Sequence, residues 1–260
     1  MLKKIVCVLA LLLSLISVQA AERFIEKTFD VESGVRISLD HYKGEIKIRT
    51  GSSQTVQVSA RVYLTEEDAR YSEEECKKLV DAMEVQFRNG KQNVSIEVDG
   101  SATGKMFSGL FTKSSTQPFV DIDMVIPDDA SLDLDSYKGT FDIVCPSRRI
   151  IFETYKGRGS ISGVRSDLSI DTYKGNLDID IEQMGNLEVE TYKGEVVIDI
   201  QGATDFTIHG DTHKGQLQID GVEASKTIND DETVLYLKEG SGANRVELDT
   251  YKGTIRLNFL

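Results

Sequence analysis

A tripeptide, Tyr-Lys-Gly, recurs along this chain at near-constant spacing, and it constrains the fold more than any other feature. From Tyr137 onward the steps between copies are 18, 18, 19, 21 and 38 residues, counting the variant His213-Lys214-Gly215. The last step spans about two periods, so one copy is expected to have lost its motif. The tyrosines of the motif are Tyr42, Tyr137, Tyr155, Tyr173, Tyr192 and Tyr251. Self-similarity at a fixed period is the sequence signature of a repeat architecture.

The flanks of the motif repeat as well. An apolar residue, an acid and usually Thr come before it, as in Ile170-Asp171-Thr172, and apolar and acidic residues alternate after it, as in 177–181. Alternation with a period of two predicts half-buried strands, so each unit reads as strand, bend, strand and linker. Glycine is expected to supply a positive φ at the bend. The bend glycines are Gly44, Gly139, Gly157, Gly175, Gly194, Gly215 and Gly253.

Such units bury their apolar side only when they stack. The sequence therefore predicts an all-β fold, a parallel β-solenoid with coils of about 18–19 residues in which equivalent strands lie about 4.8 Å apart. Leu, Ile, Val and Thr are expected to point inward. The acids before the motif would form an outward column, and we expect the motif lysines to offset its repulsion. These acids are Asp135, Glu153, Asp171, Glu190, Asp211 and Asp249.

The repeats occupy residues 118–260, and two other segments precede them. Residues 1–20 combine a basic start, an apolar run and Val18-Gln19-Ala20, which is typical of a secretory signal peptide. Residues 21–117 are expected to form a β-rich cap. Within it we predict a helix over about 65–84, with Thr65 and Asp68 as capping box, and a loop over about 100–117 rich in Gly, Ser, Thr and Lys.

Charge and cysteine content limit the possible partners. After removal of residues 1–20 the chain keeps 28 basic and 43 acidic residues, a net charge of −15. That balance argues against binding nucleic acid or anionic lipid, and no later segment is apolar enough to cross a bilayer. The protein is therefore expected in the periplasm, outside the cell or on its surface. Cys76 and Cys145 could pair there, although a buried thiol at Cys145 is the simpler expectation.

The order of these segments resembles a known family. A secretory signal, a strand pair with a glycine bend at Ile37–Ile48, a short helix, a strand ending in Val125-Ile126-Pro127, and glycine-bend repeats of the Leu-Asp-Leu-Asp type are similar to the putative-adhesin family of bacterial envelope proteins, a domain of unknown function. The resemblance implies a β-solenoid at the cell envelope with an adhesive role and supplies no catalytic residues. Many members carry Ser-Gly or Asn-Gly at the bend, where this chain carries Tyr-Lys-Gly.

No standard catalytic motif is present in the sequence. It lacks Gly-x-Ser-x-Gly, His-Glu-x-x-His and a phosphate-binding glycine loop. His209, Asp211 and His213 would share one side of a strand, as zinc ligands could, but substitution within a repeat explains them as well. Acid pairs such as Asp178 and Asp180 could serve a glycosidase or calcium, but a solvated outer face is the simpler interpretation. We therefore expect no catalytic site, no metal and no cofactor.

The tyrosines and lysines are the candidate binding residues. If Thr172 points inward, the next ring points outward, so the repeats would present an aromatic stripe with adjacent cations, suited to a glycan or protein surface. Alternatively, the rings only cover the corner and stiffen the coil. Other functions left open are a sensory partner in envelope stress and a polysaccharide-active β-helix enzyme. The stripe comprises Tyr137, Tyr155, Tyr173, Tyr192, Tyr251, Lys138, Lys156, Lys174 and Lys193.

Overall fold

The structure is a computed structural model that describes residues 21–65, 71–99, 116–145, 148–202, 205–222, 225–229 and 232–260. It contains one helix and one mixed 18-stranded sheet that is not closed. The expected all-β class is therefore confirmed. The predicted signal segment 1–20, residues 66–70 and residues 100–115 of the expected loop lie outside the described residues. None of the helices described is long and apolar enough to cross a membrane.

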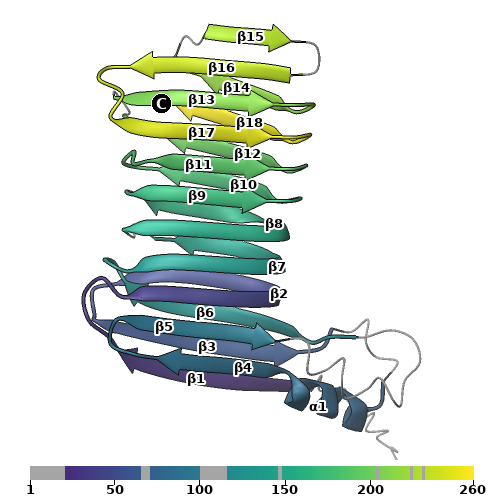
Figure 1. Ribbon diagram of the computed structural model, residues 1–260. Helices are drawn as coiled ribbons and strands as arrows, with labels where there is room; N and C mark the ends of the chain where they lie inside the picture. The colour runs from purple at the N-terminus through teal and green to yellow at the C-terminus, as the bar shows by residue number, and fades with distance from the viewer. Residues whose placement is uncertain are drawn as a thin grey trace, which may run out of the picture.

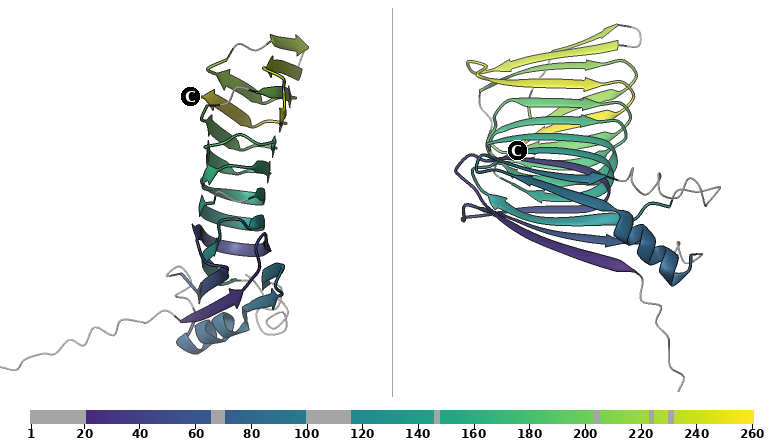
Figure 2. Two further views of the ribbon diagram at one scale, coloured as in Figure 1. Left: turned by 90° about the vertical axis from the view of Figure 1, so that its left-hand side faces the viewer. Right: turned by 60° about the horizontal axis from the view of Figure 1, so that its bottom comes forward.

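The sheet folds into two facing layers (Figures 1 and 2). In the first layer every neighbouring pair from β5 to β13 is parallel, and the outer pairs at both ends are antiparallel. From bottom to top in Figure 1, its strands are β4 (Glu84–Asn89), β5 (Asn93–Asp99), the first halves of β2 (Arg36–Gly51), β7 (Ser131–Val144) and β8 (Arg149–Val164), then β9 (Asp167–Thr172), β11 (Leu187–Thr191), β17 (Asn244–Thr250), β13 (Phe206–Thr212), β16 (Glu232–Glu239) and β15 (Ser225–Asn229).

The second layer also has a parallel central part. Its parallel part runs from β6 to β14, and β1 and β3 pair antiparallel below it. Its strands are β1 (Glu22–Asp30), β3 (Thr55–Tyr63), β6 (Phe119–Pro127), the second halves of β2, β7 and β8, then β10 (Asn176–Ile181), β12 (Glu195–Ile200), β18 (Thr254–Phe259) and β14 (Gln216–Asp220). Since β2, β7 and β8 pass through both layers, they connect them at the Tyr-Lys-Gly corner.

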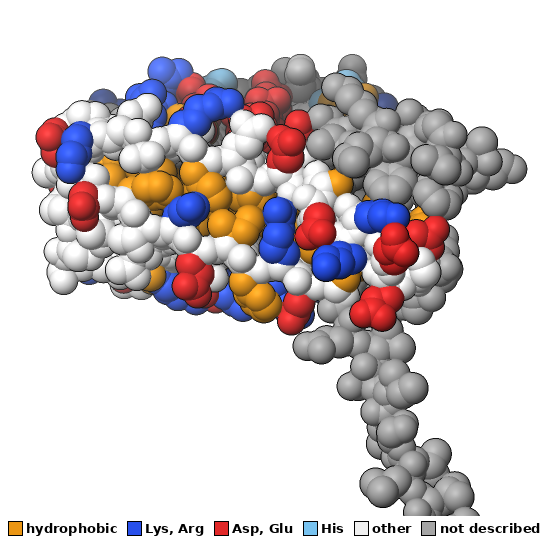
Figure 3. Space-filling model, turned by 90° about the horizontal axis from the view of Figure 1, so that it is seen from below, with side chains coloured by type: hydrophobic (Ala, Val, Ile, Leu, Met, Phe, Trp, Pro, Cys, Tyr) orange, Lys and Arg blue, Asp and Glu red, His pale blue; other side chains and the backbone are white. Residues whose placement is uncertain are grey.

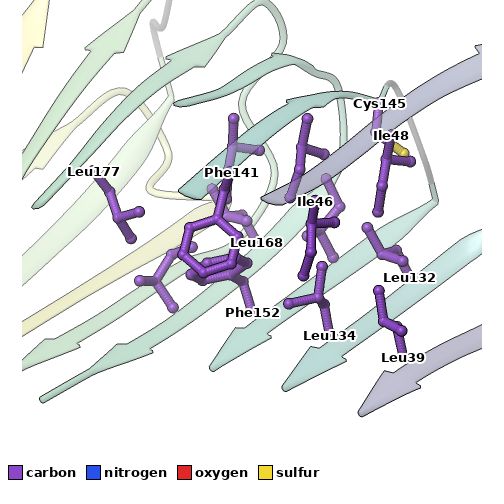
Figure 4. Close-up of a cluster of buried hydrophobic side chains, with 14 of the residues drawn as sticks. Leu39, Ile46, Ile48, Leu132, Leu134, Phe141, Cys145, Phe152, Leu168 and Leu177 are labelled. Atoms are coloured by element: carbon purple, nitrogen blue, oxygen red, sulfur yellow. The ribbon is translucent and has the colours of Figure 1, made fainter. Parts of the chain in front are cut away.

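The hydrophobic core fills the space between the layers. In β10, for example, Leu177, Ile179 and Ile181 are buried while Asp178 is exposed, so the expected alternation is confirmed. Figure 4 shows side chains of both layers meeting there. The ring of Phe141 packs edge-on against that of Phe152, with a centroid distance of 4.8 Å. At the bottom of the stack, hydrophobic side chains run along the middle of the end face, with charged side chains around them (Figure 3).

The order of the upper rungs differs from the order of the chain. The C-terminal pair β17–β18 lies between β11–β12 and β13–β14, because β17 pairs with both β11 and β13, and β18 pairs with both β12 and β14. The long step from His213 to Tyr251 was expected to contain a coil without its motif, and that expectation is wrong. Strands β15 and β16 instead pair antiparallel, and β16 also pairs with β13.

The single described helix is shorter than expected. Helix α1 spans Glu73–Ala82, and its capping box joins Ser72 and Glu75. The helix does not begin at the expected box of Thr65 and Asp68, of which Asp68 lies outside the described residues. Ser72 offers the same kind of pattern, Ser-x-x-Glu, about two turns before the buried residues. Leu79 and Val80 are buried.

Candidate binding surface

The motif rings form one continuous ladder along the corner of the stack. From bottom to top its order is Tyr42, Tyr137, Tyr155, Tyr173, Tyr192, Tyr251 and His213. Neighbouring ring centroids lie 4.7–5.3 Å apart, and the planes deviate from parallel by only 3–12°. The five tyrosines predicted as a stripe are thus brought together. Because each ring covers its neighbours' faces, the ladder presents mainly ring edges and hydroxyl groups to a partner.

The motif lysines lie beside the rings. Nζ of Lys156, Lys174, Lys193 and Lys252 stands 5.8, 5.1, 5.3 and 5.1 Å from the centroid of the tyrosine that precedes it. These distances are within the range of cation–π attraction. The expected pairing of lysines with the acid column is wrong for the part of the chain that the structure describes, where no ion pair joins the two columns. The ring ladder separates the motif lysines from the acid column.

Hydroxyl groups anchor each upper bend from inside. The residue before each motif tyrosine is a buried Thr or Ser, or His41 at the bottom. In the upper rungs the Thr Oγ1 accepts a hydrogen bond from the bend glycine, for example 2.6 Å from Gly175 N to Thr172 and 3.0 Å from Gly194 N to Thr191. The inward orientation predicted for Thr172 is therefore confirmed, and it closes a tight turn.

The reason for glycine at the bend is different from the one predicted. Of the seven motif glycines only Gly44 has a positive φ in the left-handed region (147°). At the others a Cβ would collide with a neighbour. At four of them the obstacle is the backbone of the adjacent rung: a Cβ on Gly194 would lie 1.9 Å from the carbonyl oxygen of Gly175, and Gly139, Gly215 and Gly253 are crowded in the same way. At Gly157 the obstacle is the Phe141 ring, and at Gly175 it is the Thr172 hydroxyl. The carbonyl oxygen of Gly175 accepts the next rung's ladder hydrogen bond from Glu195 N at 3.0 Å. A side chain at position 194 would push the rungs apart.

The acids before the motif do form a column on the outer face of the first layer. Their registers place each acid beside the next, and the column begins with Asp40 below Asp135. Partial burial, with repulsion from neighbouring acids at most positions, raises the pKa of six of them. These six are Asp40, Asp135, Glu153, Asp171, Glu190 and Asp249.

His41 ends the hydroxyl column at the bottom as a buried neutral imidazole. Its Nε2 donates to the carbonyl of Val120 at 2.7 Å, so its Nδ1 accepts from the hydroxyl of Ser136 at 3.1 Å. Burial lowers the pKa of His41 to about 4. Its role is structural, and its position in the Thr slot of the repeat is the signal that predicts it.

Two grooves flank the lower part of the ring ladder. One, of about 500 Å³, is lined by Asp40, Asp135, Tyr137 and Tyr155 on the acid side. The other, of about 580 Å³, is lined by Lys138, Lys156, Arg158 and the bend glycines, with Tyr63 and Phe119 as its aromatic wall. Reasoning from the repeat missed Tyr63 and Phe119 because they lie on β3 and β6, outside the motif. Arg158 directly follows a bend glycine and could have been found from that position.

The alternative metal site is not assembled. His213 stacks on Tyr251 at 5.0 Å as the last ring of the ladder, whereas His209 lies on the outer face of β13. Among the residues with described positions, no group of three or more His, Cys, Asp or Glu could hold a metal ion. Cys145 is fully buried in the core, as expected, and Cys76 lies on α1.

Comparison with known proteins gives weak similarities only. No protein-family model matches the sequence, and neither does any curated protein. A solved putative cell adhesion protein from Clostridium sporogenes aligns with 92% of this chain and 100% of its own, at 12% identity and a TM-score of 0.45. A putative adhesin from Bacteroides fragilis aligns over 90% and 97%, at 9% identity and a TM-score of 0.28.

A third solved structure is described as a putative lipid binding protein, from Parabacteroides distasonis. It aligns over 91% of this chain and 96% of its own, at 10% identity and a TM-score of 0.25. TM-scores at this level, with so little sequence identity, do not establish a shared fold.

Proposed function

We propose that this chain is an exported, non-catalytic β-solenoid of the cell envelope that binds a glycan or protein partner along its Tyr/Lys ladder, as an adhesin or scaffold. The observation that carries the proposal is the continuous row of seven aromatic rings with lysines alongside. The parallel in-register ladders of both layers support the solenoid. The segment 1–20 supports export, and residues 21–117 serve as a cap that contributes β2 to the array.

Repetition along a straight line makes weak contacts effective. Each exposed contact between a lysine or ring edge and a partner is worth on the order of 1 kcal/mol. A partner with its own repeat engages several rungs at once, and the later contacts are intramolecular. The lysines are available for this role because, in the described part of the chain, they form no ion pair with the acid column.

The lysines allow a test that leaves the ring ladder intact. We compare the mature protein with Lys174→Gln/Lys193→Gln/Lys252→Gln for retention on intact bacterial cells and on an immobilised panel of envelope glycans. The matched control, Lys27→Gln/Lys77→Gln/Lys91→Gln, changes net charge equally at exposed positions away from the ladder. We expect at least a tenfold loss of retention for the first variant and none for the control. Equal retention of both variants and the wild type would contradict the proposal.

A further inference from the structure

The groove on the lysine side of the ladder is lined in part by glycine backbone. Gly44, Gly139 and Gly157 occupy successive rungs in register along it. The groove, of about 580 Å³, has the volume of a small binding cleft. It is bordered on one side by Lys138 and Lys156 and on the other by the pair Tyr63 and Phe119, whose ring centroids are 5.7 Å apart.

The charge in this groove is mainly positive and unneutralised. Lys138, Lys156 and Arg158 are exposed, and within the described part of the chain none of them forms an ion pair. Of the two acids that line the groove, one is paired with a cation and the other accepts hydrogen bonds from neutral donors. Glu45 pairs with Lys47 at 2.7 Å, and Asp121 accepts from Glu45 N at 2.9 Å and from the hydroxyl of Tyr63 at 3.3 Å. An anion entering the groove therefore meets three cations without carboxylate partners.

The surrounding strands disfavour a peptide as occupant. An extended peptide gains most of its affinity by adding to an open sheet edge. Here β2 pairs with β6 and β7, and β8 pairs with β7 and β10, so the strands beneath the groove have no free edge. A polar, open trough with exposed cations suits the hydroxyl and acidic groups of a sugar chain. The aromatic wall contributes shape rather than a stacking surface, because Lys43 covers the Phe119 ring at 3.8 Å and Arg61 covers the Tyr63 ring at 4.5 Å.

We propose that this groove binds the acidic sugars of a linear glycan, whose carboxylate or sulfate groups contact Lys138, Lys156 and Arg158. The glycan chain continues upward along Lys174 and Lys193, where rungs repeat at the same 4.7–5.3 Å spacing as the rings. The acid column does not oppose this path, because Asp135 and Tyr137 line the groove on the opposite side of the ladder. This inference rests on the proposed function and narrows its partner to an acidic glycan.

The test is calorimetric titration of the mature protein with three hexasaccharides: galacturonic acid, its carboxyl-reduced neutral counterpart, and a sulfated oligosaccharide of equal length. We expect the acidic probes to bind at least tenfold more tightly than the neutral one, with affinity falling as salt rises. The variant Lys138→Gln/Lys156→Gln/Arg158→Gln should lose at least tenfold in affinity for the acidic probes. The control Lys27→Gln/Lys77→Gln/Lys91→Gln should keep wild-type affinity, and thermal melting verifies that both variants are folded.

Preference between the galacturonate and sulfated probes identifies the acidic group. The inference is overturned if the neutral hexamer binds equally, if the groove variant keeps full affinity, or if free sulfate alone competes as well as the hexamers. It is also overturned if neither acidic probe binds. The proposed function is contradicted by a different result, namely full retention on cells of the triple variant of Lys174, Lys193 and Lys252. If the groove variant is unaffected while that ladder variant loses retention, the ladder binds a different partner.

Discussion

At the scale of single residues, the bend glycines show how one residue type can satisfy two different requirements. Positive φ requires glycine or asparagine, whereas close approach between rungs excludes every side chain. Gly194 belongs to the second class, since a Cβ there would overlap the carbonyl oxygen of Gly175, and Gly202 belongs to the first, with φ at 62° and open space around it. The two classes respond differently to the same substitution.

We predict that Gly194→Asn lowers the free energy of unfolding by about 1–3 kcal/mol or more, as overpacking does. Gly202→Asn should change it by no more than about 0.5 kcal/mol, because asparagine tolerates the left-handed region and nothing crowds this position. Urea unfolding of both variants measures the difference. If Gly194→Asn is as harmless as Gly202→Asn, close approach is not the reason for glycine at the bend.

Residue columns were largely predictable from the sequence, because each column reads off one position of the repeat. Burial of Thr172 and exposure of the neighbouring acids follow from period-two alternation. The reason for the bend glycines did not follow, since the sequence carries no information on the distance between rungs at the corner. The sequence also did not show that each tyrosine ring would be covered by its neighbours. That stacking depends on how the rings are oriented, and the alternation of inward and outward residues does not determine ring orientation.

At the scale of elements, the ring ladder stabilises the stack as well as presenting a surface. Replacing Tyr155, Tyr173 and Tyr192 together by Ser removes four stacked contacts. At about 0.5–1.5 kcal/mol for each aromatic pair, we predict a loss of roughly 2–6 kcal/mol and a melting temperature lower by many degrees. The triple Tyr→Phe control keeps the rings and should melt near the wild type. Equal melting of the Ser variant and the wild type would show that stacking contributes nothing.

The acid column makes stability depend on pH. Folding raises the pKa of its members, so the stability they contribute is fully present below their unfolded pKa values, 3.8 for Asp and 4.5 for Glu, and is lost as pH rises through the folded values. The folded protein is therefore destabilised by these acids at neutral pH. His41 acts in the opposite direction, because stability from its neutral form is lost as pH falls from 6.5 to about 4.

We predict that Asp135→Asn/Glu153→Gln/Asp171→Asn raises the melting temperature at pH 7.5. Its advantage over the wild type should shrink as pH falls toward 4, because the native acids then become protonated. The control Glu26→Gln/Asp30→Asn/Asp178→Asn removes the same charge from exposed acids outside the column and should show a smaller gain. A gain that is independent of pH would contradict the raised pKa values.

At the scale of the whole molecule, the C-terminal strands fill a gap left in the stack. Terminal units of repeat proteins usually contact only one neighbour. Here β17–β18 contact rungs on both sides. The chain places β13–β14 one rung beyond the position next to β11–β12, and β17–β18 later occupy that position. The sequence could not predict this order, because every Tyr-Lys-Gly rung is compatible with every other. The pairing of β2 with β7 could not be predicted from the sequence for the same reason.

Deletion of residues 244–260 should therefore cost more than loss of an ordinary terminal repeat. Two interfaces disappear, and the rungs on either side expose buried side chains such as Val189 and Ile208. We predict loss of cooperative unfolding in the upper part of the stack, measured by calorimetry and hydrogen exchange. A single cooperative transition close to that of the full mature chain would mean that β13–β14 can move down and close the gap.

The rung order of the in-register ladder can be tested by cysteine crosslinking. In a Cys76→Ala background, where Cys145 is buried and inert, a one-carbon bis-methanethiosulfonate reagent joins exposed cysteines on adjacent rungs. We expect efficient intramolecular crosslinking of Glu190→Cys with Asp249→Cys, which are direct neighbours, and of Asp249→Cys with Asp211→Cys. Glu190→Cys with Asp211→Cys, two rungs and about 9.6 Å apart, should not react. Crosslinking of 190 with 211 but not with 249 would contradict this rung order.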